Sequence, residues 1–139
     1  MQTFILLFLF TTCHALLGSI GRKQSVGAMG KLTCNGRPAQ GIKVKLYDEE
    51  IIADRKLDQD RTDESGKFML SGTAREISPI DPHLNIYHKC NYGGPCHKKI
   101  TIKIPPKYVN GGDEVERYFD LGTLELATMS KKQSTDCIN

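Results

Sequence analysis

The stretch Ile42-Lys43-Val44-Lys45-Leu46-Tyr47 decides the fold, because its apolar side chains alternate with lysines and a tyrosine. Successive side chains of an extended strand point to opposite faces, so Ile42, Val44 and Leu46 share one face. This period of two predicts a β-strand with one buried face. The same alternation recurs in Lys98-Lys99-Ile100-Thr101-Ile102-Lys103-Ile104, where Pro105-Pro106 ends it.

Shorter strands of the same kind lie on both sides of these two. Alternation and turn signals predict strands at 30–34, 66–70, 84–88 and 118–126, and a further strand that ends at Arg61-Thr62. In 118–126 the apolar positions change from odd to even numbers at Gly122, which predicts a β-bulge. Segment 73–77 is expected to form one helical turn. Together these elements predict an all-β sandwich of seven to eight strands over about 22–127.

The predicted core collects the inward-facing apolar residues of these strands. Its members are Leu32, Val44, Leu46, Phe68, Leu70, Leu84, Ile86, Ile100, Ile102, Leu121 and Leu124. The segment 128–139 is polar and is expected to be a loose tail that Cys137 tethers.

Composition narrows the class of protein further. A chain of 139 residues that is 39% hydrophobic has room for one domain. Its net charge of +3 is too balanced for a dedicated nucleic-acid binder. The apolar run at 4–10 has the length of a signal-peptide core and is too short to cross a bilayer. We therefore expect a signal peptide at 1–21, cleaved between about 15 and 21, and secretion; the alternative is a short membrane anchor.

Four cysteines follow the predicted cleavage site, namely Cys34, Cys90, Cys96 and Cys137. In a small secreted domain they indicate two disulfides, and their spacing leaves all three connectivities open. A zinc site in His88-x-Cys90-(x)5-Cys96-His97 is the alternative. Disulfides are favoured, because adjacent Cys96 and His97 would point to opposite faces of a strand. No metal and no cofactor are therefore expected.

Catalytic and calcium sites find little support in the sequence. His83, His88 and His97 have no accompanying nucleophile motif, and His88 is expected to be a hydrogen-bonded, partly buried structural residue. The carboxylates of 58–64 lack the glycine that an EF-hand loop needs at its sixth position. No catalytic residue is predicted.

Charge is unevenly distributed along the chain, with eight acidic and three basic residues between 48 and 64. A basic group at Lys98, Lys99 and Lys103 stands beside the loop that contains Tyr92. Lys99 and Lys103 share the solvent face of their strand, and tyrosine is enriched in interface cores. These four residues are the predicted binding site. The alternative is that the lysines protect an edge strand from aggregation.

A series of short motifs runs in order from about Gly27 to Cys137. They are GKLTCNGRP at 30–38, GxKVxLY at 41–47, TDESGKF at 62–68, IDPxLxIYHxC at 80–90, KxTIxIP at 99–105 and DLGTL at 120–124. Together they resemble the nematode-type transthyretin-like family. The resemblance implies a secreted, immunoglobulin-like sandwich with no established enzymatic activity and no agreed ligand.

The resemblance also implies a disulfide pairing, because the first and last strands of such sandwiches share a sheet. We expect Cys34–Cys137, with Cys90–Cys96 closing a loop between neighbouring strands. The rival pairing, Cys34–Cys90, would cross between the sheets as in immunoglobulin domains.

The function expected from these observations is extracellular binding without catalysis, by a monomer that recognises a protein or an anionic lipid headgroup, with no nucleic acid and no membrane span. The alternative is a carrier of a small hydrophobic ligand or lipid. A 5-hydroxyisourate hydrolase fits less well, because the chain ends Thr135-Asp136-Cys137-Ile138-Asn139 and lacks that family's terminal Tyr-Arg-Gly-Ser.

Overall fold

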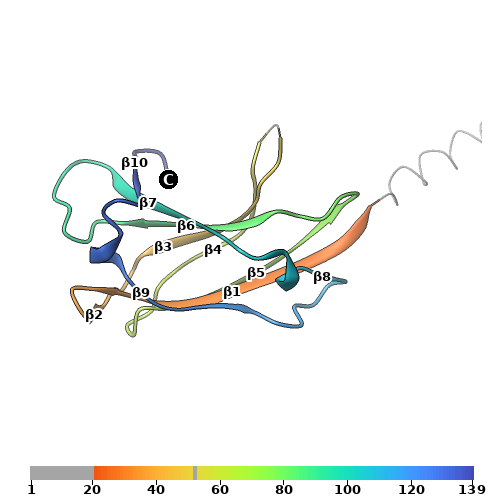
Figure 1. Ribbon diagram of the computed structural model, residues 1–139, viewed down its shortest axis with the longest axis horizontal. Coiled ribbons are helices and arrows are strands. Elements are labelled where there is room, and N and C mark those ends of the chain that lie inside the picture. Colours follow the sequence, from red (N-terminus) through yellow and green to blue (C-terminus); the bar gives the residue numbers. More distant parts are fainter. Residues whose placement is uncertain (1–20, 52) are drawn as a thin grey trace, which may run out of the picture.

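The computed structural model describes residues 21–51 and 53–139. The predicted signal peptide lies outside the described residues, apart from Gly21. Two sheets pack face to face (Figure 1). Among the described residues, no helix is long and apolar enough to cross a membrane.

The first sheet is built around the long strand β1 (Arg22–Cys34). It pairs with β5 (Lys67–Glu76), with the short strands β2 (Arg37–Pro38) and β8 (Asn110–Gly111), and in parallel with β9 (Phe119–Glu125). The second sheet has the order β10 (Ser134–Asp136), β7 (His97–Lys103), β6 (Pro82–His88), β3 (Lys43–Asp48) and β4 (Arg55–Arg61). Two 3₁₀ turns, η1 (Pro106–Tyr108) and η2 (Leu126–Met129), connect the later elements.

The core lies between the two sheets, as the alternation predicts. Eight of the predicted core residues are buried, namely Leu32, Val44, Leu46, Phe68, Leu70, Leu84, Ile86 and Ile100. Ile102, Leu121 and Leu124 are only half-buried and pack against the rim of the core. The sequence pattern missed the first half of β1, where Val26 and Ala28 are fully buried.

The predicted bulge at Gly122 is confirmed. Asp120 lies opposite Met29 and Thr123 opposite Lys31, so two residues of β9 face the single residue Gly30. Gly122 has a φ of 75°, which glycine adopts without steric cost.

The predicted helical turn at 73–77 is wrong, because these residues continue β5 as far as Glu76. Thr73 and Ala74 pair with Ser25 and Gln24 of β1. The long partner strand thus supplies tertiary hydrogen bonds that override a weak local preference for helix.

The C-terminal tail is more ordered than the sequence predicts. After η2, the strand β10 pairs with β7, Asp136 lying opposite His97 and Ser134 opposite Lys99. The tail therefore forms one edge of the second sheet.

The two disulfides are present, but the predicted pairing is wrong. The structure joins Cys34 to Cys90 and Cys96 to Cys137, with Cα–Cα distances of 5.8 and 4.4 Å. Cys34 ends β1 and Cys90 follows β6, so this bond crosses between the sheets at one end of the sandwich. Cys96 precedes His97 and Cys137 follows Asp136, and those two residues are paired across the ladder. The antiparallel register of β7 and β10 thereby brings the second pair of cysteines together.

Candidate functional site

The outer face of the second sheet carries a band of positive side chains. The strand registers place Arg61, Lys43, Tyr87 and Lys99 in one row across β4, β3, β6 and β7. The next row contains Gln59, Lys45, Asn85 and Thr101, and the third contains Lys56, Tyr47, His83 and Lys103. We call the six basic residues of these rows, Lys43, Lys45, Lys56, Arg61, Lys99 and Lys103, the cationic face.

The side chains of β6 on this face are buried, although they lie on the side of the sheet opposite the core. Tyr87 and Asn85 are 5% and 8% exposed. The Lys45 ammonium lies 5.1 Å from the Tyr87 ring centroid, and the Thr101 hydroxyl donates to Asn85 Oδ1 over 2.7 Å. Long lysine stems thus cover the middle of the sheet while their charged ends stay in water.

The positive charges on this face repel one another, and few negative charges lie close enough to offset the repulsion. Burial lowers the pKa of Lys43, and the positive charges of Arg61, Lys45 and Lys56 lower it further. Lys43 Nζ donates to the main-chain oxygen of Asn139 over 2.8 Å. Carboxylates of the described residues lie at the margins of this face: Asp81 is 3.9 Å from Lys103, Asp54 is 3.7 Å from His83, and Asp136 lies on β10.

The predicted binding residues fall into two groups. Lys99 and Lys103 stand on the cationic face. Lys98 faces the other way, and its ammonium lies 4.5 Å from the Tyr92 ring centroid and donates to Thr135 Oγ1. Tyr92 itself donates to the Pro95 carbonyl. Lys98 and Tyr92 therefore brace the loop between β6 and β7, away from the cationic face.

Sequence reasoning missed the contribution of β3 and β4. The alternation of Lys43 and Lys45 with Val44 and Leu46 already placed those lysines on the solvent face. The segment 48–64 is acidic as a whole, and this net charge hid the contribution of Lys56 and Arg61. In β4, Lys56 and Arg61 lie on the opposite face of the sheet from Asp58 and Asp60. Asp58 and Asp60 share the face of Leu46 and Val44, and Asp58 accepts the Ser71 N–H there.

His88 is hydrogen-bonded, as predicted, and is buried more deeply than expected, at 1% exposure. Its Nδ1 accepts the Cys90 N–H and its Nε2 lies 2.9 Å from Gln133 Oε1. Nδ1 is thus unprotonated and Nε2 carries the hydrogen. Both cysteines of the zinc alternative are in disulfides, so that set of ligands is not available.

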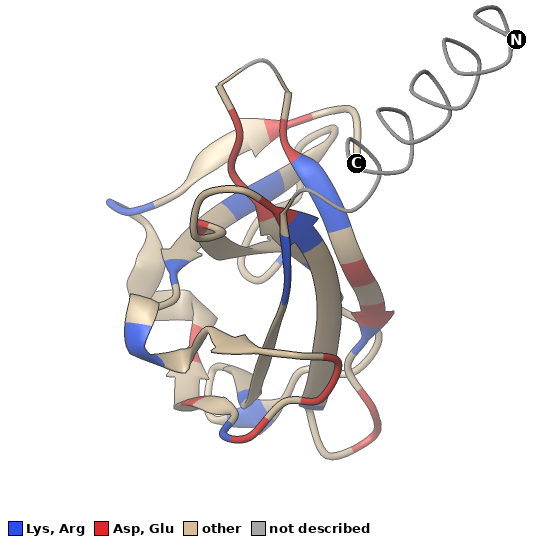
Figure 2. Cartoon of the chain, turned by 90° about the vertical axis from the view of Figure 1, so that its right-hand side faces the viewer, with Lys and Arg blue, Asp and Glu red and all other residues tan. Residues whose placement is uncertain are grey.

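Acidic residues gather in the loop that joins β3 to β4, at both of its legs (Figure 2). Asp48, Glu50 and Glu76 have carboxylate oxygens within 4.8 Å of one another. Arg55 bridges two of them, at 2.8 Å from Glu76 and 3.3 Å from Glu50. A hydrogen bond with Glu76 is the main cause that raises the pKa of Glu50, followed by burial. The cluster is thereby explained as an ion-pair network.

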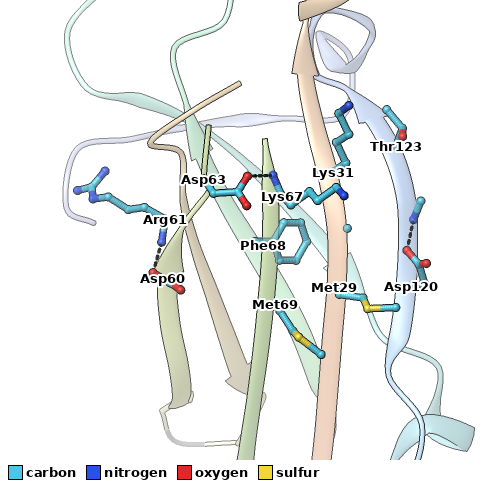
Figure 3. Close-up of a pocket in the computed structure, with 12 residues that line it drawn as sticks. Met29, Lys31, Asp60, Arg61, Asp63, Lys67, Phe68, Met69, Asp120 and Thr123 are labelled. Carbon is cyan, nitrogen blue, oxygen red and sulfur yellow. Dashed lines mark hydrogen bonds between the residues drawn. The ribbon is translucent and has the colours of Figure 1, made fainter. Parts of the chain in front are cut away.

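The first sheet carries a groove of about 600 Å³ on its outer side (Figure 3). Met29 and Met69 are paired across β1 and β5, with Lys31 and Lys67 as the next pair. Asp60, Asp63 and Asp120 line the groove as well, so its charges are mixed.

The fold and its surfaces define a class: a small β-sandwich stapled between its sheets by a disulfide, with one cationic sheet face. The chain belongs to the transthyretin-like family, whose model TTR-52 matches residues 29–105. Transthyretin-like protein 5 of Caenorhabditis elegans is 46% identical and aligns over 100% of both chains.

Two further Caenorhabditis elegans relatives support this assignment. Transthyretin-like protein 2 is 35% identical over 90% of each chain, and transthyretin-like protein 33 is 38% identical over 84% of this chain and 83% of its own. Among solved structures, a 9R-lipoxygenase from Cyanothece PCC8801 aligns with 73% of this chain and 16% of its own, at 18% identity and a TM-score of 0.38. That similarity is too low to carry an argument.

Proposed function

We propose that this protein is a secreted, monomeric binding module that recognises an anionic partner through the cationic face and catalyses no reaction. The observation that carries the proposal is the arrangement of six basic side chains from β3, β4 and β7 on one sheet face. Such a surface raises the local concentration of an anionic partner and steers its approach.

Secretion is supported by the apolar run at 4–10 and by the two disulfides. Disulfides persist in oxidising compartments and are rare in the cytosol. The short domain has limited core, and covalent staples compensate for that in secreted proteins.

A binding role is also supported by the environments of the described histidines. His83 stacks on Tyr47 with a centroid distance of 5.7 Å, and His88 is enclosed by hydrogen bonds. His97 Nδ1 accepts from the Asn139 side chain. None of the three lies beside a free thiol or within a hydrogen bond of a serine hydroxyl in the described part of the chain.

The test is capture of partners from extracellular material by the secreted product of the full-length chain. Wild type is compared with the triple variant Lys43→Glu, Lys45→Glu, Lys99→Glu. The matched control is Lys23→Glu, Lys107→Glu, Lys132→Glu, which makes the same charge change at exposed positions outside the cationic face. We expect partners to be lost with the first variant and kept with the control. Equal capture by all three folded proteins would refute the proposal.

A second candidate, carriage of a small apolar ligand, is favoured by the Met29–Met69 pair in the groove. Carriers bury most of their ligand's surface, whereas this groove is open and carries three aspartates. Titration of a fluorescent fatty acid into wild type and Met29→Glu decides this candidate: saturable binding that the variant loses would support it.

A further inference from the structure

The cationic face is most strongly positive at the end away from the β3–β4 loop. Lys103 has Asp81 beside it, and His83 in the same row has Asp54. Arg61, Lys43, Lys45 and Lys99, in the other two rows, have no Asp or Glu side chain within ion-pair distance among the described residues. Two of them donate to main-chain oxygens, Lys43 to Asn139 and Arg61 to Gly41. They extend from β4 to β7, a width of about 14 Å at three strand spacings.

These four charges are spread across the sheet and do not converge on one point. The side chains come from three strands and two rows, and Tyr87 separates Lys43 from Lys99. A single phosphate or carboxylate could contact only one or two of them. The arrangement suits a ligand that carries a series of anionic groups.

A flat anionic surface cannot approach this face closely. The β3–β4 loop stands out from the sandwich on the side of the second sheet (Figure 1). Its Asp54 carboxylate lies 3.7 Å from His83 Nε2. The loop carries Glu49 and Glu50 as well as Asp54, so a planar bilayer of anionic lipid would press against its negative charges (Figure 2). A narrow chain could lie across the strands beside the loop.

The groups between the cations indicate which narrow polyanion would bind. Thr101 and Ser134 are exposed hydroxyls and Gln59 is an exposed amide, which suit hydrogen bonds with sugar hydroxyls. Tyr87 is covered by Lys45 and offers no open ring for a nucleic-acid base to stack on. An acidic protein would bury an apolar centre in its interface. Of the exposed large hydrophobic side chains, Ile51, Met69 and Ile77 are not on these strand rows, and Ile138 precedes Asn139, which contacts Lys43 at the end of the face.

We infer that the cationic face binds a linear sulfated polysaccharide, which lies across β4, β3, β6 and β7 and contacts Arg61, Lys43, Lys45 and Lys99. This inference rests on the proposed function and specifies its ligand. Binding of this kind is driven by the release of counterions, so its affinity must fall steeply as salt rises.

The experiment measures binding of the secreted protein to immobilised heparin between 50 and 300 mM salt. Competitors are chemically desulfated heparin, polyglutamate and vesicles that contain phosphatidylserine. The face variant Lys43→Gln, Lys45→Gln, Lys99→Gln is compared with the control Lys23→Gln, Lys107→Gln, Lys132→Gln. Circular dichroism establishes that both remain folded.

We expect at least a tenfold loss of heparin affinity in the face variant, less than threefold in the control, and no competition by desulfated heparin. Equal heparin affinity in the two variants would overturn the inference. So would competition by polyglutamate or vesicles as strong as by heparin, although the proposed function would then stand. If heparin does not bind but partner capture still depends on the cationic face, the inference of a polysaccharide ligand is overturned and the proposed function stands.

Discussion

Asn35 and Asn91 donate to each other's side-chain oxygens, with Asn35 Nδ2 2.8 Å from Asn91 Oδ1 and Asn91 Nδ2 3.0 Å from Asn35 Oδ1. Each asparagine directly follows a cysteine of the Cys34–Cys90 disulfide. Both have left-handed backbones, with φ of 55° and 54°. The two hydrogen bonds of the amide pair therefore reinforce the disulfide that links the sheets. They also hold the start of the loop that carries Tyr92.

The amide pair predicts an energetic coupling between its members. We expect Asn35→Gly and Asn91→Gly each to destabilise the protein, and the double variant to cost about 1 kcal/mol less than the sum. Glycine is chosen because it accepts the positive φ and isolates the hydrogen bonds. Urea unfolding of the four proteins measures the coupling; strictly additive effects would contradict a direct interaction.

Gly66 predicts a large effect from a single methyl group. Its φ is 79°, and a Cβ there would overlap the main-chain oxygen of Leu32. That oxygen accepts from Ala39, while Leu32 N–H donates to the Gly66 carbonyl. Gly36 is a matched control, with a φ of 78° and no atom within 4 Å of a Cβ. We expect Gly36→Ala to cost about 1 kcal/mol and Gly66→Ala at least about 3 kcal/mol. Equal midpoints in urea would contradict the steric argument.

How much the sequence could predict depends on whether the signal is local. Alternation in 42–47 and 98–104 is a local pattern, and β3 and β7 form there. The bulge at Gly122 also follows from a local change of phase. The disulfide pairing depends on which strands become neighbours, and no local feature of Cys96 shows that β10 will pair with β7. The full extent of the cationic face was not predicted for the same reason, because Arg61 comes next to Lys43 only through the register between β3 and β4.

His88 predicts a pH-dependent loss of stability. Burial is the main cause that lowers its pKa below the ordinary 6.5, and the nearby charges of His97 and Lys98 act in the same direction. Below pH 6.5 the His88 imidazole is protonated in the unfolded chain, whereas in the folded protein it stays neutral until a lower pH. The stabilisation is therefore complete above that pH and is lost as pH falls towards the lower folded-state pKa.

The measurement is the free energy of unfolding in urea at pH 7.5, 6.0 and 5.0. We expect wild type to lose stability across this range, and His88→Gln to be less stable at pH 7.5 but to show a flatter profile. His97→Gln, at a half-buried histidine, is the control and should keep most of the wild-type slope. A profile of His88→Gln as steep as that of wild type would assign the dependence to other groups.

The two disulfides predict different consequences when each is removed. Their sequence separations are 56 residues for Cys34–Cys90 and 41 for Cys96–Cys137. In the chain-entropy description each closes a loop worth about 4 kcal/mol, so loop size does not distinguish them. Position does: Cys34–Cys90 holds the two sheets together, whereas Cys96–Cys137 holds only the edge strand β10 against β7.

We therefore expect Cys96→Ala, Cys137→Ala to release the tail locally, with fast amide hydrogen exchange confined to 130–139 and to 97–99 of β7. Cys34→Ala, Cys90→Ala should instead raise exchange throughout both sheets and lower the urea midpoint of global unfolding more strongly. Hydrogen exchange read by mass spectrometry separates the two patterns. Identical exchange in both variants would show that β10 unfolds only together with the sandwich.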